Sequence, residues 1–198
     1  MVIVTDPYDE LMGYPMPELT ADIVIVSHWH HDHNNVAAVE GEPEVVTGAG
    51  EHLCKGLRFL GVATYHDTSR GAERGGNTIF LFDVDELRLC HLGDLGHILD
   101  ESQVKSVREK DLDILFIPVG GVFTLDAGGA NEVLGQLNPK IAVPMHYKTP
   151  PLRLGVQNES RFLEGKRRVR REKQLLLHKK DLPEELEIVV LDWRHHYI

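Results

Sequence analysis

Short runs of apolar, mostly β-branched residues recur along this chain, and they limit the folds that it can adopt. Such runs form β-strands, and a run without any polar member is typical of a strand that is buried on both faces. We predict strands at residues 1–5, 23–26, 61–65, 77–82, 87–91, 114–117, 141–143 and 188–191. We therefore expect a fold built around β-sheets.

Two helical patterns lie between the predicted strands. Residues 101–110 follow Asp100 and residues 127–137 follow Asp126, and an aspartate before a helix accepts hydrogen bonds from the first backbone N–H groups. The second pattern carries apolar residues at helical spacing and ends before Pro139. Strands mixed with helices, without an internal repeat, indicate a layered α/β domain.

Length and charge exclude several classes of protein. With 198 residues, the chain fits one domain that spans residues 1–198. The formal net charge of -10 at pH 7 argues against a nucleic-acid partner, because Lys and Arg supply most of that affinity. The basic run at residues 166–173 is accordingly predicted to be the solvated face of a C-terminal helix rather than a binding patch. No stretch is long and apolar enough to span a membrane and no secretion signal is found, so we expect a cytoplasmic protein without a membrane partner.

A histidine-rich segment follows the predicted strand at residues 23–26. It contains His28, His30, Asp32 and His33 in the order H-x-H-x-D-H. Residues two apart in an extended chain point to the same side, so His28 and His30 can reach one metal ion. A turn at Asp32 and His33 can deliver a carboxylate and an imidazole to a second ion. The alternative is a polar surface loop that happens to hold several histidines, and ligands elsewhere in the chain decide between the two.

Three further candidate ligands stand at the ends of predicted strands. They are His66, Asp94 and His146. Because α/β sheets gather their site residues at strand ends, these side chains are well placed to join the histidine-rich segment. The two cysteines, Cys54 and Cys90, are far apart and lack the spacing of a thiolate metal site, so we expect nitrogen and oxygen ligands alone.

The order of these ligands resembles the metallo-β-lactamase superfamily, and the phrases around them resemble its ascorbate-6-phosphate lactonase-like branch of metal-dependent hydrolases. The phrases are TDP at residues 5–7, ADIV at 21–24, HLGDLGH at 91–97, IPVGG at 117–121 and PMHY at 144–147. The resemblance covers about residues 4–149 and implies an α/β fold, the four-layer αββα sandwich. Members usually begin with a β-hairpin, which we expect to be missing here. A missing hairpin would leave an unpaired sheet edge, which favours a homo-oligomer.

The resemblance implies a dinuclear metal site. Carried over residue by residue, it assigns His28, His30 and His66 to a first ion, Asp32, His33 and His146 to a second, and Asp94 to the position between them. A bridging carboxylate would hold two divalent ions about 3.5–4 Å apart. We expect Zn²⁺, while Mn²⁺ or Fe also suits nitrogen and oxygen donors.

The resemblance further implies a hydrolase. We expect a hydroxide that bridges the metals to attack a carbonyl or phosphoryl centre, with Asp32 and Asp94 as catalytic residues. The expected substrate is a small molecule: a soluble ester, lactone or phosphoester. A phosphodiesterase or nuclease of the same superfamily is one alternative, and a non-catalytic metal-binding protein is another.

Other polar residues near the motifs could act around the metals. His97 is predicted to support a ligand or contact substrate, with a helix-capping or surface role as the alternative. Tyr147 and Lys148 could meet substrate or be ordinary loop residues. Asp6 and Asp22 could orient ligand histidines through their second ring nitrogen. The remaining histidines are predicted to lie away from the metals: His31, His52, His178, His195 and His196.

Overall fold

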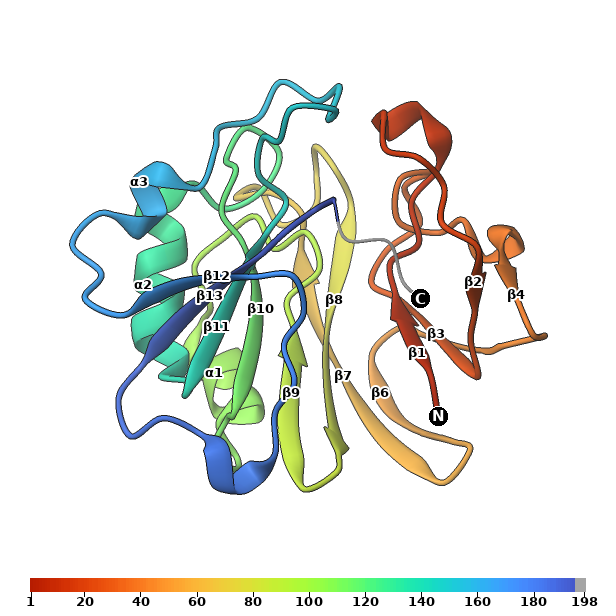
Figure 1. Ribbon diagram of the computed structural model, residues 1–198, viewed down its shortest axis with the longest axis horizontal. Helices are drawn as coiled ribbons and strands as arrows, with labels where there is room; N and C mark the ends of the chain where they lie inside the picture. Colours follow the sequence, from red (N-terminus) through yellow and green to blue (C-terminus); the bar gives the residue numbers. More distant parts are fainter. Residues whose placement is uncertain (195–198) are drawn as a thin grey trace.

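The computed structural model describes residues 1–194, so the predictions for His195 and His196 lie outside the described residues. A large and a small β-sheet pack against each other, and the helices α1, α2 and α3 lie on the other side of the large sheet (Figure 1). With 3-10 helices denoted η, the elements in chain order are β1 (Ile3–Thr5), η1 (Glu10–Met12), β2 (Leu19–Thr20), β3 (Ile23–Val26), η2 (Val36–Ala38), β4 (Val39–Glu40), β5 (Glu44–Thr47), β6 (Gly50–Cys54), β7 (Leu57–Tyr65), β8 (Gly76–Val84), β9 (Leu87–His91), α1 (Glu101–Val107), β10 (Ile114–Pro118), α2 (Ala127–Leu137), β11 (Ile141–Met145), α3 (Ser160–Leu163), β12 (Val169–Glu172), η3 (Lys179–Asp181) and β13 (Glu187–Leu191).

The large sheet has the strand order β12-β13-β11-β10-β9-β8-β7-β6. Its strands β6 to β9 are antiparallel neighbours, whereas β9, β10, β11, β13 and β12 are parallel neighbours. Two antiparallel steps restore the direction of a strand, so β7 runs the same way as β9. The carboxyl ends of β7, β9, β10 and β11 therefore lie at one edge of the large sheet.

The small sheet consists of β1, β3 and β5, all parallel, with β3 in the middle. All four residues of β3 are buried, as its uninterrupted apolar run predicts. No strand within residues 1–194 pairs with the outer edge of β1. The expectation of a missing N-terminal hairpin stays a prediction.

Apolar side chains fill the spaces between these layers. One cluster joins α1, α2 and α3 to the large sheet, through residues such as Val107, Val133 and Phe162. A second cluster joins the two sheets, with Ile25 of β3 against Phe80 of β8. The outer face of the small sheet is covered by β2, β4 and η2. Within the described residues, that outer layer contains no α-helix, so the expected α/β sandwich has α-helices on one side only.

Each predicted strand is present: β7, β8, β10, β11 and β13 extend beyond the predicted bounds, β3 and β9 match them, and β1 begins at Ile3 instead of Met1. The helix expected at residues 101–110 ends at Val107, and the helix at 127–137 has the predicted bounds. The prediction of a helix at residues 166–173 was wrong, because Val169–Glu172 forms the edge strand β12. Arg170 pairs with an acid on the neighbouring strand, since its Nε donates to Glu187 over 3.0 Å, and Arg171 donates to Glu159 before α3 over 2.7 Å.

None of the described helices is both long and apolar enough to cross a lipid bilayer. The two cysteines, Cys54 and Cys90, are buried and do not form a disulfide bond.

Candidate metal centre

Strand ends from both sheets deliver the candidate ligands to one place. His28 follows β3 of the small sheet, whereas His66, Asp94 and His146 follow β7, β9 and β11 of the large sheet. Because β7, β9 and β11 end at the same edge of the large sheet, their ligands converge although they are far apart in sequence. The centre therefore lies where this edge meets the histidine-rich segment of the small sheet.

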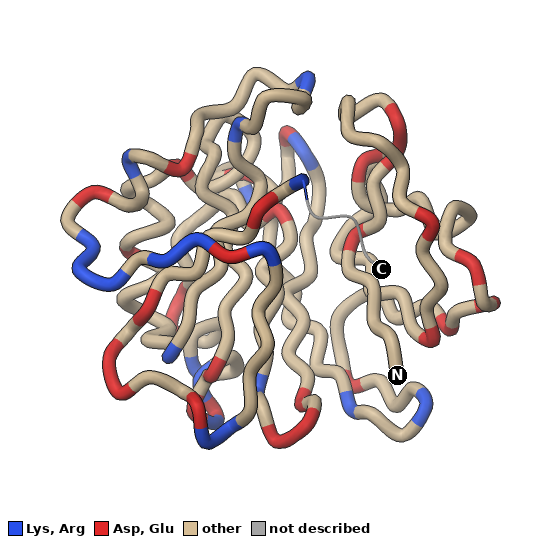
Figure 2. The backbone as a smooth tube through the Cα atoms, in the orientation of Figure 1, with Lys and Arg blue, Asp and Glu red and all other residues tan. Residues whose placement is uncertain are grey.

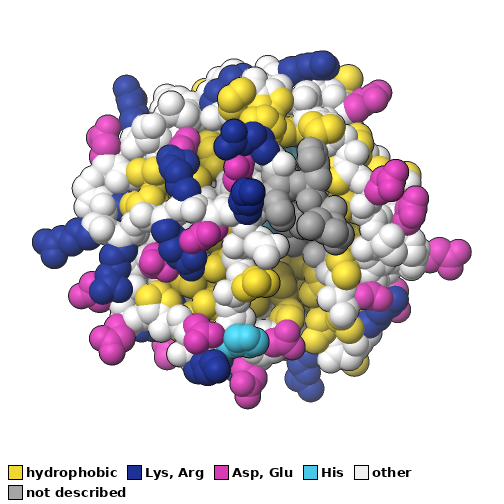
Figure 3. Space-filling model, in the orientation of Figure 1, with side chains coloured by type: hydrophobic (Ala, Val, Ile, Leu, Met, Phe, Trp, Pro, Cys, Tyr) yellow, Lys and Arg dark blue, Asp and Glu magenta, His cyan; other side chains and the backbone are white. Residues whose placement is uncertain are grey.

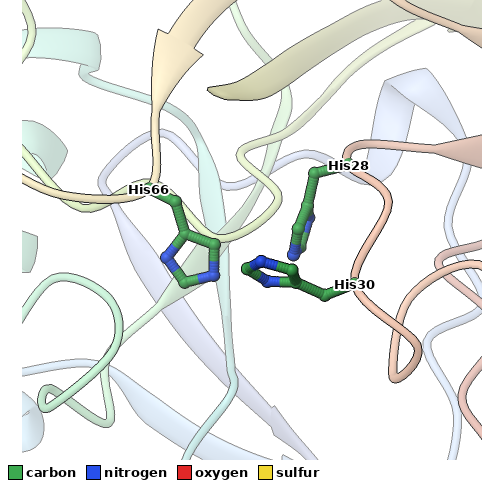
Figure 4. Close-up of side chains that lie close together, drawn as sticks. All are labelled: His28, His30 and His66. Carbon is green, nitrogen blue, oxygen red and sulfur yellow. The ribbon is translucent and has the colours of Figure 1, made fainter. Parts of the chain in front are cut away.

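The first cluster consists of His28, His30 and His66. One nitrogen of each ring lies within 4.8 Å of the others. Figure 4 shows the three rings turned toward a common point, two from the segment after β3 and one from the end of β7. His28 and His66 are buried, whereas His30 is exposed. The structure thus brings together the three residues that were predicted to hold the first metal.

A second cluster consists of His33, Asp94 and His146. Asp94 lies between the histidines of this cluster and those of the first. Its Oδ2 atom lies 3.0 Å from Nε2 of His66 and 3.9 Å from Nε2 of His28. The same oxygen lies 3.3 Å from Nε2 of His33 and 3.4 Å from Nε2 of His146. One carboxylate oxygen therefore faces four imidazole nitrogens, two from each side.

Hydrogen bonds fix the ring nitrogens that can bind a metal. Nδ1 of His66 donates to the carbonyl of Phe123 over 3.0 Å, and Nδ1 of His33 donates to Asp6 over 3.2 Å. A neutral imidazole carries one proton, so Nε2 of each ring is left with a lone pair. Both lone pairs point at Asp94, an arrangement that is unfavourable unless a proton or a metal cation lies between them.

His28 shows most directly that a cation fits this site. Asp6 accepts from the backbone N–H of Ser27 over 2.7 Å and from its hydroxyl over 2.6 Å. The Ser27 oxygen then accepts from Nδ1 of His28 over 2.9 Å, which leaves Nε2 of His28 unprotonated. That nitrogen is buried and has no hydrogen-bond partner among the described residues. An unpaired buried acceptor costs about 1–3 kcal/mol, and a metal ion at Nε2 would satisfy it.

Electrostatics agree with this reading. Burial, together with the neighbouring His33, lowers the pKa of His28 to about 4, so its ring is neutral near pH 7. Burial also lowers the pKa of His33, but Asp94 and Asp6 outweigh it and hold that pKa well above the ordinary value. Burial raises the pKa of Asp94, but His33 and His146 outweigh it and hold that pKa well below the ordinary value. Asp94 is therefore an anion that attracts positive charge to the centre.

Asp6 and Asp32 differ in their suitability as ligands. Asp6 lies within metal-binding distance of His28 and His33, but its two oxygens already accept hydrogen bonds from Ser27 and His33. We therefore regard Asp6 as a residue that orients ligands. Asp32, a predicted ligand, has Oδ2 3.6 Å from Nε2 of His33 and stands beside the second cluster.

A network of polar groups holds the loop that carries Asp94. The Asn77 side chain accepts from the backbone N–H of Asp94 over 2.9 Å and donates to the carbonyl of Leu92 over 2.9 Å. Gly93 between them has φ 55°, and a Cβ there would lie 2.3 Å from the Asn77 side-chain oxygen. His91 accepts from the N–H of Gly93 over 3.1 Å. Asp94 is thus fixed through its backbone, and its carboxylate remains available.

The loop after β10 approaches the second cluster closely. A Cβ on Gly120 would lie 2.1 Å from the carbonyl oxygen of His146, so only glycine fits there. His146 itself has φ 51°, a conformation that most residues avoid. The glycines that follow β10 therefore allow His146 to turn toward Asp94.

A cavity of about 390 Å³ opens beside the second cluster. Asp32, His33, Asp94 and His146 line one part of it, and apolar and aromatic side chains line the rest. Its size is typical of a small-molecule site. The first cluster does not line this cavity, so a bound small molecule would approach the centre from the side of the second cluster.

The residues predicted to support ligands or contact substrate take different places. His97 accepts from the backbone N–H of Tyr65 over 3.2 Å and so braces the strand end next to His66. Tyr147 lines the cavity. The Lys148 ammonium donates to the carbonyls of Leu152 and Leu154, within its own loop, instead of entering the cavity.

Among the other aspartates and histidines considered in the sequence, some contact a ligand histidine and the rest lie away from the clusters. Asp6 contacts a ligand histidine, whereas Asp22 accepts from the backbone N–H of Val2 over 2.6 Å and contacts none. His31 pairs with Asp9 over 2.9 Å and points away from the clusters. His52 bonds to a backbone carbonyl, and His178 precedes η3, both outside the centre.

Sequence reasoning did not identify Ser27, Asn77, His91 or the Phe123 carbonyl as supports of the ligands. Ser27 and His91 stand next to or inside the recognised phrases, so their position was a usable signal. The Phe123 carbonyl offered none, because a backbone oxygen has no sequence signature.

Comparisons with known proteins agree with this geometry. Residues 1–146 match the family model described as the beta-lactamase superfamily domain. A metal-dependent hydrolase of Carboxydothermus hydrogenoformans is 36% identical, over 74% of this chain and 77% of that protein. A metal-dependent hydrolase of Thermus thermophilus is 32% identical, over 76% of this chain and 78% of that protein.

Solved structures show the same fold. A Thermotoga maritima protein, described as a candidate Zn-dependent hydrolase of the metallo-β-lactamase superfamily, superimposes with a TM-score of 0.79 at 37% identity, covering 96% of this chain and 88% of that one. A candidate metal-dependent hydrolase from Parabacteroides distasonis superimposes with a TM-score of 0.60 at 19% identity, covering 96% and 85%.

Proposed function

Since this chain belongs to the metallo-β-lactamase superfamily and is a metal-dependent hydrolase of it, we propose that two divalent ions, with zinc as the expected metal, occupy its two clusters and that it hydrolyses a small ester, lactone or phosphoester. The observation that carries the proposal is the position of Asp94. Its Oδ2 lies within 3.9 Å of Nε2 of four histidines, two from each cluster. A carboxylate in that position can bind an ion on either side.

The protein's own groups have distinct roles in this proposal. Nε2 of His28, His30 and His66 would hold the first ion, and Nε2 of His33 and His146 the second. Bound divalent ions would supply Lewis acidity, which makes water a nucleophile near neutral pH and polarises a carbonyl or phosphoryl oxygen. Asp32 borders the cavity and has Oδ2 3.6 Å from Nε2 of His33. It is suited to accept a hydrogen bond from the attacking water and to orient it.

The reaction balances without a side-chain nucleophile. For a carboxylic ester, the water oxygen forms a bond to the carbonyl carbon, and the bond between that carbon and the alcohol oxygen breaks. One water proton passes to the departing alcohol, and the acid remains. No serine or cysteine lines the cavity among the described residues, in keeping with direct attack by water.

The donor set limits the choice of metal. Three imidazoles at the first cluster, and imidazoles with carboxylates at the second, suit zinc. Manganese and iron accept the same donors and are the alternatives. The two buried cysteines are not among the groups that could hold a metal within residues 1–194.

A phosphodiesterase or nuclease activity is the main alternative, and a non-catalytic metal-binding role is another. The net charge of -10 opposes a polyphosphate substrate, and an open cavity beside the second cluster supports catalysis over metal binding alone. We predict that residues 1–198 form one domain, that the protein is cytoplasmic, that it acts on a small molecule, and that its unpaired sheet edge allows a homo-oligomer.

The direct test is hydrolysis by protein reconstituted with zinc or with manganese. A panel of lactones, carboxylic esters, phosphomonoesters and phosphodiesters distinguishes the substrate classes, and protein treated with a chelator is the control. We expect turnover that requires metal. A loaded protein that hydrolyses no member of the panel would remove the support for a catalytic role.

A further inference from the structure

The cavity beside the second cluster has one reactive end and one apolar end. Asp32, His33 and His146 form the reactive end. Met12, Leu152 and Leu154 lie at the other end and belong to an apolar cluster between the loop after β1 and the loop after β11. A molecule with its reacting carbonyl at the metals would therefore place a neighbouring group against an apolar wall.

Aromatic rings continue this wall. The ring of Tyr14 lies 5.6 Å from that of Tyr8 and 6.0 Å from that of Trp193, between ring centres. All three line the cavity. Aromatic rings that pack against each other in this way form a rigid apolar surface that an aliphatic or aryl group can contact.

Contacts between the loop after β1 and the loop after β11 hold the apolar wall in place before a ligand binds. The backbone N–H of Arg153 donates to the carbonyl of Met12 over 3.0 Å. Gly13 has φ 92°, and a Cβ there would lie 2.3 Å from the carbonyl oxygen of Pro151. A wall that is already in place binds apolar groups without a large cost of ordering.

The charged residues that line the cavity disfavour an anionic group there. Asp6, Asp32 and Asp94 line it, and no Lys or Arg of residues 1–194 does. Lys148, which follows the lining residue Tyr147, is held by the carbonyls of Leu152 and Leu154.

The net charge of the N-terminal part of the chain is also negative. Residues 1–50 contain nine Asp and Glu and no Lys or Arg. In Figure 2 the tube of β1 to β5 carries red segments and no blue ones, while blue segments lie nearby at the turn between β6 and β7, and Figure 3 shows acidic side chains on the same side of the surface. A phosphate group away from the metals would lack a cationic partner among the described residues that line the cavity.

We infer that the cavity binds the uncharged, apolar part of the substrate, so that the substrate is a neutral carboxylic ester or lactone with an aliphatic or aryl group rather than a phosphorylated sugar derivative. The inference rests on the proposed function, because it assumes that hydrolysis occurs at the two clusters. It narrows that function to one class of substrate.

The first test is a series of γ-lactones hydrolysed by the zinc-loaded wild-type protein, with a side chain that grows from hydrogen to hexyl. Each methylene that enters the cavity should raise kcat/KM about two- to fourfold until the wall is covered. Gluconolactone and its form phosphorylated at the primary hydroxyl make the charged comparison, in which the phosphorylated form should be the slower. A flat series, or faster turnover of the phosphorylated form, would overturn the inference and leave the hydrolase proposal intact.

A matched pair of variants tests the wall itself. Leu154 is partly buried in the cavity wall, and Leu176 is 82% exposed and outside it. Leu154→Lys should lower kcat/KM for the hexyl lactone at least about tenfold and favour the phosphorylated lactone, whereas Leu176→Lys should change neither. Equal effects of the two variants would contradict a role for this wall.

A binding measurement keeps the inference testable even if no lactone is hydrolysed. Hexanol added to the zinc-loaded protein should change the fluorescence of Trp193 and reach saturation. The change should disappear in Trp193→Phe and persist in Trp29→Phe, because Trp29 is 67% exposed and does not line the cavity. Fluorescence that does not saturate would show that the cavity does not bind apolar groups.

Discussion

Nδ1 of His33 lies 3.2 Å from Oδ2 of Asp6, whose side chain is buried next to the second cluster. The same aspartate also accepts two hydrogen bonds from Ser27, which in turn bonds to His28. Asp6 therefore fixes the proton positions of one histidine in each cluster. A single buried carboxylate that binds no metal in our assignment prepares both sites for metal.

The first prediction concerns this carboxylate. Asp6→Asn keeps the size of the side chain but presents an amide to His33, so the ring is no longer held with its Nε2 lone pair toward Asp94. Metal affinity at the second cluster should fall about 10–100-fold. Competition with a chromophoric chelator measures it. Asp22→Asn removes a carboxylate that contacts no ligand histidine and is the matched control, and equal affinities for the two variants would refute the role of Asp6.

The second prediction concerns the bridge. Wild-type protein should bind close to two divalent ions per chain. Asp94→Asn removes the charge between the clusters, so the second ion should be lost while the three histidines of the first cluster keep theirs. Elemental analysis together with the rate on the best substrate measures both effects, and turnover should fall steeply.

His52→Ala and His178→Ala are the controls for that variant, because neither histidine lies at the centre. Both should retain two ions and wild-type turnover. If Asp94→Asn behaved like these controls, Asp94 would not be the bridge.

The third prediction concerns removal of the metals. The imidazoles face a buried carboxylate, and Nε2 of His28 has no partner among residues 1–194 without an ion. A ligand bound only by the folded state stabilises it by about 2.7 kcal/mol at one hundred times its dissociation constant. The thermal midpoint should therefore fall when a chelator removes the ions and recover when zinc is returned. An unchanged midpoint would indicate that the clusters are stable without metal.

The fourth prediction uses two glycines. Gly120→Ala would push a methyl group into the His146 carbonyl, so it should cost about 1–3 kcal/mol of stability and weaken the second ion. Gly135 lies in α2 with open space around its Cα, and Gly135→Ala should stabilise the protein by about 0.5–1 kcal/mol. Denaturant unfolding and metal titration measure both. A tolerated Gly120→Ala would show that the loop after β10 can move without displacing His146.

The sequence indicated the strands well, because an uninterrupted apolar run such as residues 23–26 can be satisfied only by burial on both faces. It failed at Val169–Glu172, where the residues themselves resemble a helix surface and only pairing with β13 makes a strand. The short strands β2, β4, β5 and β6 were missed for the same reason. Strand formation there depends on a partner that is distant in sequence.

The sequence likewise predicted one part of the candidate centre, and only the tertiary structure shows the rest. The spacing of His28, His30, Asp32 and His33 by itself determined that one segment could serve two ions, since side-chain direction follows from local backbone geometry. Tertiary structure alone decided that Asp6 and not Asp22 supports a ligand, and that a backbone carbonyl holds His66. It also placed an apolar wall beside the second cluster, in a cavity that no Lys or Arg of the described residues lines. These features arise from loops that approach each other across two sheets, and no local pattern encodes such an approach.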